Sequence, residues 1–251
     1  MTSSQGSGAR DRALDLLKWL AVLSMLLDHL RYVGWSVDWL YAPGRLAFPW
    51  FCLAIAVNVR RAADRPGRAF DWRYLFWLLL FSFVAEWPYR LYMAGEAYNW
   101  NVMPTLALGM LVAQAWYERT REALLLGVLA LVFAAWFAGP LMFGLPGVLL
   151  PLACAIVLRK SLPWALLPGV LCLFANAWQA IFKGVGWGEP ISTAALLVCV
   201  LAPLLGMALL RGRVAFGVWP MRRWAYAVYP VHFLLLLGVR LWIAWEPGYD
   251  F

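Results

Sequence analysis

The sequence predicts an all-α fold: a polytopic bundle of transmembrane helices. Hydrophobic residues make up 64% of the 251 residues and charged residues only 14%, and the mean hydropathy is +0.71. Apolar runs of about 20 residues recur along the chain, the length that a helix needs to cross a bilayer. The 17 tryptophans fit the same class, because Trp favours membrane interfaces.

The apolar segments divide the chain into about nine spans, with eight to ten compatible with the pattern. Most connections contain Pro, Gly or charged residues, which interrupt helices. The region 122–158 is ambiguous, because Gly139-Pro140 divides it. The expected spans are residues 14–34, 45–61, 73–93, 101–117, 122–138, 140–158, 161–181, 191–210 and 224–245.

Basic residues in the connections predict the orientation. With the N-terminus in the cytoplasm, fifteen of the 21 Lys and Arg residues lie on the inner side and five on the outer side, as the positive-inside rule requires. The expected organisation is a cytoplasmic tail (1–13), a single transmembrane domain (14–245) and an outer tail (246–251). The N-terminus lacks a signal-peptide pattern, so we expect the first span to act as its own insertion signal.

Several function classes lack support. The net charge of +8 does not indicate nucleic acid, because the charges lie in short loops between apolar segments. The four cysteines lie inside apolar segments without metal-ligand spacing, so neither a disulfide framework nor a metal site is expected. The sequence contains no P-loop and no Gly-x-Ser-x-Gly motif.

The first span is unusual because it contains Asp15, Lys18, Asp28 and His29. Charged residues within a span are costly and mark functional sites by default. A helix turns by about 100° per residue, so Lys18 and His29 lie within roughly 20° of each other on one face. We therefore expect the remaining helices to be arranged around this one.

Other polar side chains collect in the outer half of the predicted bundle, among them Arg45, Glu86, Asn101 and His232. A histidine can act as a general base near neutral pH, and an arginine can stabilise an oxyanion. Simpler roles stay open: Asp28 and Glu86 can neutralise Arg31 and Arg90, and Asn176 and Gln179 can bridge helices. The spacing alone predicts histidine chemistry or proton coupling in an outward-leaning cavity.

Six blocks resemble the TraX family, which is associated with acetylation of conjugative pilin and is similar to the wider type-3 acyltransferase-like membrane enzymes. They are DH in MLLDHLRYVG, GRLAFPWFCLAIAV, RYLFWLLLFSFVAEWPYRL, NVMPTLALGML, FGLPGVLLP and YAVYPVHFLLLL. The resemblance implies an acyltransferase in the bacterial inner membrane. It would move acetyl from cytoplasmic acetyl-CoA to a pilin N-terminus, a glycan or a lipid.

The resemblance also implies roles for individual residues. His29 would be the general base, oriented by Asp28, and Arg45 would stabilise the carbonyl oxygen or bind the acceptor. The other substrate-binding candidates are Glu86, Arg90, Asn101 and His232. The phosphates of the CoA donor would suit Lys18, Arg60, Arg61, Arg65 and Arg68.

One block departs from the family pattern. The family reads Asp-Tyr-Gly where this chain has Met142-Phe143-Gly144, so a carboxylate and a hydroxyl are replaced and the acceptor becomes uncertain. Two alternatives remain. One is a proton-coupled transporter using His29, His232, Asp28 and Glu86, and the other is a non-catalytic pilus-assembly subunit.

Overall fold

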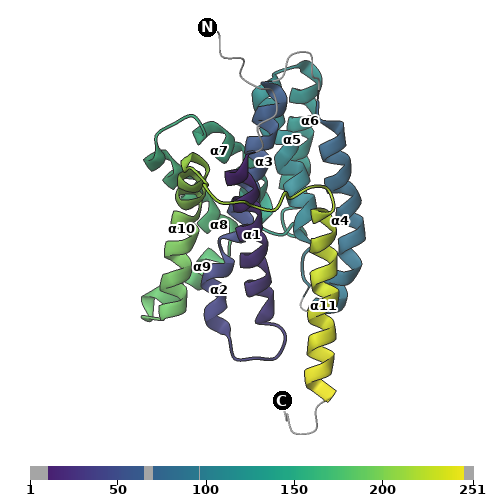
Figure 1. Cartoon of the computed structure of the whole chain (residues 1–251), viewed down its shortest axis with the longest axis vertical. Coiled ribbons are helices and arrows are strands. Elements are labelled where there is room, and N and C mark those ends of the chain that lie inside the picture. Colours follow the sequence, from purple (N-terminus) through teal and green to yellow (C-terminus); the bar gives the residue numbers. More distant parts are fainter. Residues whose placement is uncertain (1–10, 65–69, 96, 246–251) are drawn as a thin grey trace.

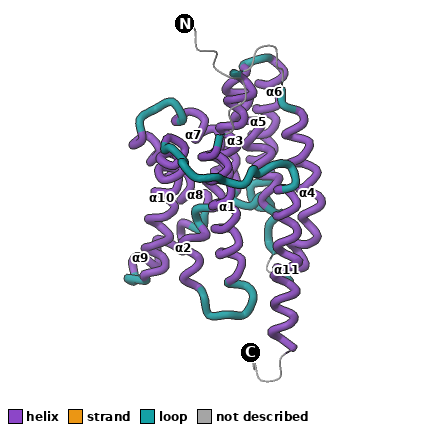
Figure 2. The backbone as a smooth tube through the Cα atoms, in the orientation of Figure 1, coloured by secondary structure: helices purple, strands orange, loops and turns teal. Residues whose placement is uncertain are grey.

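The computed structural model describes residues 11–64, 70–95 and 97–245, and this part of the chain is built from helices and loops without a strand (Figure 2). The all-α prediction is therefore confirmed. The helices are α1 (Arg12–Leu30), α2 (Tyr41–Gly44), α3 (Ala47–Ala63), α4 (Trp72–Met93), α5 (Val102–Glu118), α6 (Arg121–Trp136), α7 (Gly144–Val157), α8 (Leu166–Ala175), α9 (Trp178–Gly186), α10 (Pro190–Arg211) and α11 (Ala225–Trp245), with 3-10 turns at Asp38–Leu40 and Leu162–Ala165.

Polar caps determine where several helices begin. The side chains of Asp11, Asp71, Asn101 and Thr120 accept hydrogen bonds from backbone N–H groups in the first turns of α1, α4, α5 and α6. Each bond satisfies one of the amides that a helix start leaves without an internal partner. The apolar runs therefore become helices that begin at a polar residue.

The structure does not confirm the nine expected spans. Among the described residues, three helical segments are long and apolar enough to cross a membrane: Asp38–Ala63, Pro190–Arg211 and Ala225–Ala244. A fourth is possible if α8 and α9, bent by 94°, form one broken span. Helices α5, α6 and α7 have 17, 16 and 14 residues, fewer than the roughly 20 that a straight crossing requires. The nine spans and the cytoplasmic N-terminus remain predictions.

The expected seventh span, 161–181, is interrupted. Helix α8 ends at Ala175 and α9 begins at Trp178, with Asn176 and Ala177 between them. The Asn176 side chain donates from Nδ2 to the Cys172 carbonyl at 2.7 Å. Such local side-chain bonds compete with helix continuation, and apolar periodicity alone does not reveal the break.

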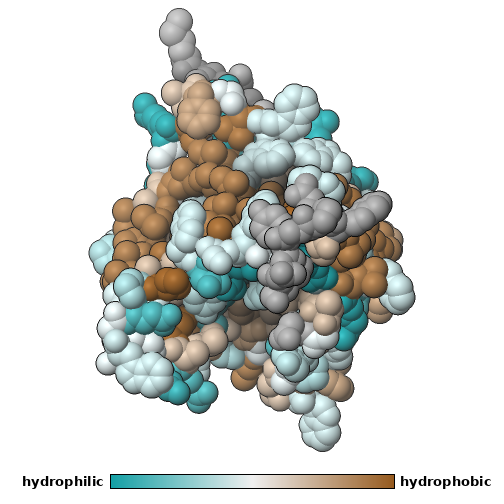
Figure 3. All heavy atoms as spheres, turned by 90° about the horizontal axis from the view of Figure 1, so that it is seen from below, coloured by the Kyte–Doolittle hydropathy of each residue, from teal (hydrophilic) through white to brown (hydrophobic). Residues whose placement is uncertain are grey.

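Helix α3 is the central element, because twelve of its seventeen residues are buried. It packs against α1, α5, α7 and α10, while α11 packs against α4. Large apolar side chains point outward, including Phe83 at 81% exposure and Trp136 at 84%. Viewed from below, brown apolar residues cover much of the flanks, whereas teal residues lie toward the middle of this end (Figure 3). Exposed apolar surface on this scale indicates a membrane protein, because lipid would cover it.

Helix α1 (purple) begins in the upper half of the molecule, and α11 (yellow) ends at the bottom (Figure 1). A segment without helix, 212–224, crosses from α10 to α11 over the face of α1. Most of both expected tails (1–10 and 246–251), and the candidate phosphate ligands Arg65 and Arg68, lie outside the described residues.

Candidate functional site

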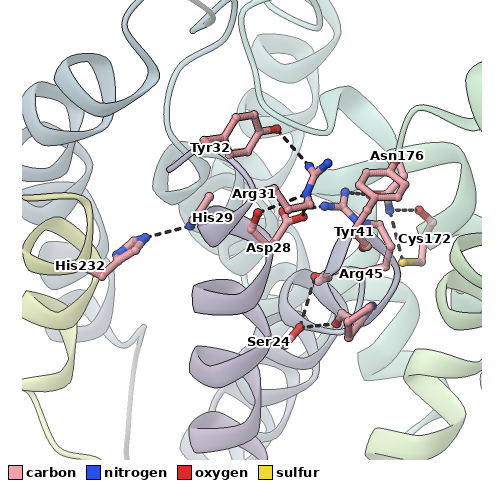
Figure 4. Close-up of polar contacts among 12 residues, drawn as sticks. Ser24, Asp28, His29, Arg31, Tyr32, Tyr41, Arg45, Cys172, Asn176 and His232 are labelled. Carbon is pink, nitrogen blue, oxygen red and sulfur yellow. Dashed lines mark hydrogen bonds and ion pairs between the residues drawn. The ribbon is translucent and has the colours of Figure 1, made fainter. Parts of the chain in front are cut away.

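The two histidines of the chain meet where α1 approaches α11. His29 Nδ1 lies 2.9 Å from His232 Nε2, and the rings stack with centroids 4.9 Å apart. Figure 4 shows the two rings pointing toward each other from α1 and α11. Tyr92 of α4 fixes the end of α1, because its hydroxyl donates to the His29 carbonyl at 2.6 Å.

The hydrogen bonds determine which nitrogen of each ring carries a proton. His232 Nδ1 lies 3.2 Å from the Val228 carbonyl, and a carbonyl only accepts, so Nδ1 is the protonated nitrogen of His232. In the neutral ring Nε2 then accepts, and His29 must donate to it from Nδ1. The Nε2 of His29 therefore keeps its lone pair, which is the electronic state that a general base needs.

Asp28 pairs with Arg31, as its simpler role predicted, and with Arg45, but it does not contact the His29 ring that it was expected to orient. Its carboxylate accepts from Arg45 Nη2 at 2.6 Å and from Arg31 Nε at 3.3 Å, while His29 faces His232. Successive residues of a helix are rotated by about 100°, so neighbours in sequence face different sides. The structure thus pairs His29 with His232 and makes Asp28 the partner of Arg45 (Figure 4).

Arg45 connects three parts of the chain. Its Nη1 donates to Asn176 Oδ1 at 2.7 Å, and its Nε donates to the Tyr41 carbonyl at 3.2 Å. The guanidinium also lies over the Tyr41 ring, 4.2 Å from the centroid. A guanidinium has five N–H donors, and three take part in these bonds and the one to Asp28. Within the described part of the chain, the other two N–H groups of this guanidinium have no hydrogen-bond acceptor.

The close approach of α2 to α1 depends on Gly44. A Cβ at this position would lie 2.5 Å from Asp28 Cβ, a distance that real side chains do not adopt. Ser24 of α1 holds the same turn, because its hydroxyl donates to the Pro43 carbonyl at 2.6 Å. The local sequence Pro43-Gly44-Arg45 therefore presents Arg45 to Asp28.

A cavity of about 70 Å³ brings several of these groups together. Its lining includes Asp28, His29, Arg45 and Asn176, and also Met142 and Phe143. The position at which this chain departs from the family pattern is thus part of the cavity wall. Phe143 stacks on Phe48 with centroids 4.0 Å apart and has a left-handed φ of 67°. Such strain in a non-glycine residue is typical of functional sites.

A second cavity, of about 330 Å³, is lined by Lys18 of α1 and by Arg222 and Arg223 of the crossing segment. Arg60 and Arg61 are not part of its lining. Arg61 pairs instead with Asp11. Of the five residues expected to bind the donor, Arg65 and Arg68 lie outside the described residues, and of the other three only Lys18 lines one of these two cavities.

Glu86 and Asn101 form a contact between α4 and α5 rather than a cavity wall. Glu86 Oε2 accepts from the Asn101 side chain at 2.7 Å and from its backbone N–H at 3.0 Å. Glu86 Oε1 accepts from Arg90 Nε at 2.6 Å. None of the three lines either cavity, and neither does His232. Their substrate-binding role remains a prediction.

The sequence did not indicate several residues of the site. Asn176 lies 131 positions from Arg45 and was interpreted as a possible helix bridge. In the sequence, Arg222 and Arg223 carry no signal beyond that of basic residues in a connection, and nothing there pairs His232 with His29. The break between α8 and α9 is signalled in the sequence by Asn176, an asparagine inside an apolar run. Among the described residues, no group of three or more His, Cys, Asp or Glu side chains is placed to hold a metal ion.

Comparison with known proteins gives a consistent family match. The family model described as TraX protein matches residues 13–240, which include His232 and every residue that lines the two cavities. A Protein TraX of Escherichia coli is 30% identical over 141 residues, covering 54% of this chain and 52% of that protein. A Protein TraX of Escherichia coli strain K12 is 26% identical over 212 residues, covering 82% and 79%. The match to the first spans about half of that relative's length, and no solved structure matches.

Proposed function

The chain belongs to the TraX family, and we propose that it is a multi-pass acyltransferase of the bacterial inner membrane. It moves an acetyl group from cytoplasmic acetyl-CoA to an acceptor at or across the membrane. The acceptor must carry a hydroxyl or an amine, as a pilin N-terminus, a glycan or a lipid can. The observation that carries this proposal is the geometry of the histidine pair and of the Val228 carbonyl, from which we infer a tautomer that leaves His29 Nε2 free to accept a proton.

The proposed reaction needs a base and an oxyanion stabiliser in one small space. His29 Nε2 takes the proton of the acceptor hydroxyl or amine as that oxygen or nitrogen attacks the thioester carbonyl carbon. The carbonyl oxygen becomes negative and is stabilised by the two remaining N–H groups of Arg45. The carbon–sulfur bond then breaks, and the departing thiolate of CoA takes the proton from His29. Both residues line the 70 Å³ cavity.

His232 is a positioning residue in this proposal. It does not line the cavity but fixes the ring of His29 and the nitrogen that bears the proton. Asp28 and Asn176 similarly hold the Arg45 guanidinium in one orientation. Fixed groups favour catalysis because they need no rearrangement when charge develops.

The test uses the full-length protein purified in detergent with acetyl-CoA labelled in the acetyl group. We expect CoA release and transfer of label to a membrane extract, with both lost in His29→Asn. Unchanged turnover in His29→Asn would remove the proposed base. Proton-driven uptake of a solute into vesicles, with no CoA release, would instead support the transporter.

A further inference from the structure

The larger cavity differs in character from the site around His29. It has a volume of about 330 Å³, within the range of ligand-binding pockets. Its lining is mostly apolar and aromatic, from α1, α3, α4, α5 and α11. The cations Lys18, Arg222 and Arg223 are part of the lining, which includes no Asp or Glu. Such a cavity suits a molecule with an anionic end and a slender, weakly polar arm.

We propose that this cavity binds the acyl donor, with the donor's phosphates at Lys18, Arg222 and Arg223 and its thioester arm directed toward His29. The inference rests on the proposed function and assigns the donor site to the 212–224 segment rather than to the end of α3. Arginine suits phosphate because its planar N–H groups bind two oxygens at once.

The two cavities follow each other along the same helices. On α1, Lys18, Val22 and Met25 line the larger cavity, and Met25 and His29 line the smaller one. These residues are spaced by three or four positions, so they form one stripe. The rise from Lys18 to His29 is about 16 Å along the helix axis. An extended arm held at Lys18 can therefore be directed along α1 toward the histidine pair.

The cavities share a wall of four residues: Met25, Phe51, Val102 and Tyr229. These come from α1, α3, α5 and α11, the helices that line both cavities. The Tyr229 hydroxyl accepts from the Val102 N–H at 3.3 Å, and the Tyr229 ring lies 5.5 Å from that of His232. One flexible, one β-branched and two aromatic side chains are thus shared by the donor cavity and the cavity at His29.

The cationic segment is tied to α1 at defined points. Trp19 donates from Nε1 to the Trp219 carbonyl at 3.0 Å, and Met221 N–H donates to Asp15 Oδ1 at 3.3 Å. The Trp19 and Trp224 rings lie 5.8 Å apart. The two arginines lie between these anchors, and both are exposed. They make no ion pair within the described ranges, so their charge is available to a ligand.

The test measures binding without catalysis, using CoA itself, whose thiol has no acetyl group to transfer. Full-length protein in detergent is titrated with CoA and, separately, with pantetheine, which lacks the phosphates. In the double variant Arg222→Gln/Arg223→Gln we expect the Kd for CoA to rise by at least about tenfold, with pantetheine binding unchanged. The matched control is Arg213→Gln, an exposed residue of the same segment outside the lining, which should bind CoA as the wild type does.

A second variant tests the apolar part of the cavity. Val22→Phe adds volume to the wall and should weaken both CoA and pantetheine, with the unfolding midpoint reporting on folding. Wild-type affinity for CoA in Arg222→Gln/Arg223→Gln, with loss in Arg60→Gln/Arg61→Gln, would overturn this assignment and leave the proposed function standing. Failure of the wild type to bind CoA would instead refute the proposed donor. Displacement of CoA by micellar phosphatidylglycerol, with no acetyl transfer by the wild type, would identify a lipid site and overturn the inference.

Discussion

His29 and His232 lie 203 positions apart in the sequence, and their ring nitrogens are 2.9 Å apart. Because His232 Nδ1 also contacts the Val228 carbonyl, we infer that each neutral ring carries its proton on Nδ1. In this arrangement His29 donates to His232, so we expect the two histidines to tolerate different replacements.

We expect His29→Asn to keep the contact with His232 but to lose the basic ring nitrogen Nε2. The Asn side-chain N–H can replace Nδ1–H toward His232, but it has no basic nitrogen. The kcat for acetyl transfer should fall by at least about 100-fold, while the unfolding midpoint stays close to that of the wild type. If the yield of folded protein fell as much as the kcat, His29 would act mainly in packing.

For His232, we expect a graded response in kcat. His232→Gln retains an oxygen that can accept from His29 Nδ1–H, whereas His232→Leu retains none. The Leu variant should lose on the order of tenfold in kcat with the donor and acceptor KM unchanged, and the Gln variant should recover part of it. Equal losses in both variants, or an effect confined to KM, would contradict a positioning role.

The Asp28–Arg45 pair should be strongly coupled, because its side chains are only 18% and 11% exposed. A double-mutant cycle of Asp28→Asn and Arg45→Gln should give an interaction free energy of about 1–3 kcal/mol, measured by detergent titration. The control is Asp64–Arg159, with side chains 56% and 69% exposed, where less than about 1 kcal/mol is expected. Similar values for both pairs would show that burial does not strengthen the contact.

Gly44→Ala should separate α2 from α1. Its new Cβ would meet Asp28 Cβ at 2.5 Å, and relief of such a clash costs about 1–3 kcal/mol. We expect a lower unfolding midpoint together with reduced acetyl transfer, since Arg45 moves with α2. Gly139→Ala is the control, because nothing lies within 4 Å of a Cβ there. Equal stability of the two variants would argue against the close approach.

Asn101→Ala separates a structural role from substrate binding. Asn101 is fully buried, caps α5 and donates to Glu86 and to the Ser82 carbonyl. Loss of a cap costs about 1 kcal/mol, and the further bonds add to this, so the unfolding midpoint should fall. A raised KM for the acceptor, with unchanged stability, would restore the substrate-binding role expected from the sequence.

The helical class and most helix positions could be predicted, because apolar runs and polar caps are local signals. The broken segment around Asn176 and the short α7 could not, since apolar composition does not distinguish a crossing helix from a buried shorter one. Within the site, the helix face of Lys18 and His29 followed from rotation per residue. The pairing of His29 with His232, and of Arg45 with Asn176, depends on packing between distant helices, which one sequence does not encode locally.

The crossing segment and α11 have a consequence for biosynthesis. His29, the proposed base, is on the first helix to be made, whereas its partner His232, the wall residue Tyr229 and the two cavity arginines lie in the last 30 residues of the chain. At about 5–20 residues per second, His29 waits roughly 10–40 s for His232 to be synthesised. Until then the first helix of the nascent protein carries His29 without its partner. A chain that stops before α11 should therefore be inactive and exposed to quality-control proteases, even if the preceding segments insert into the membrane.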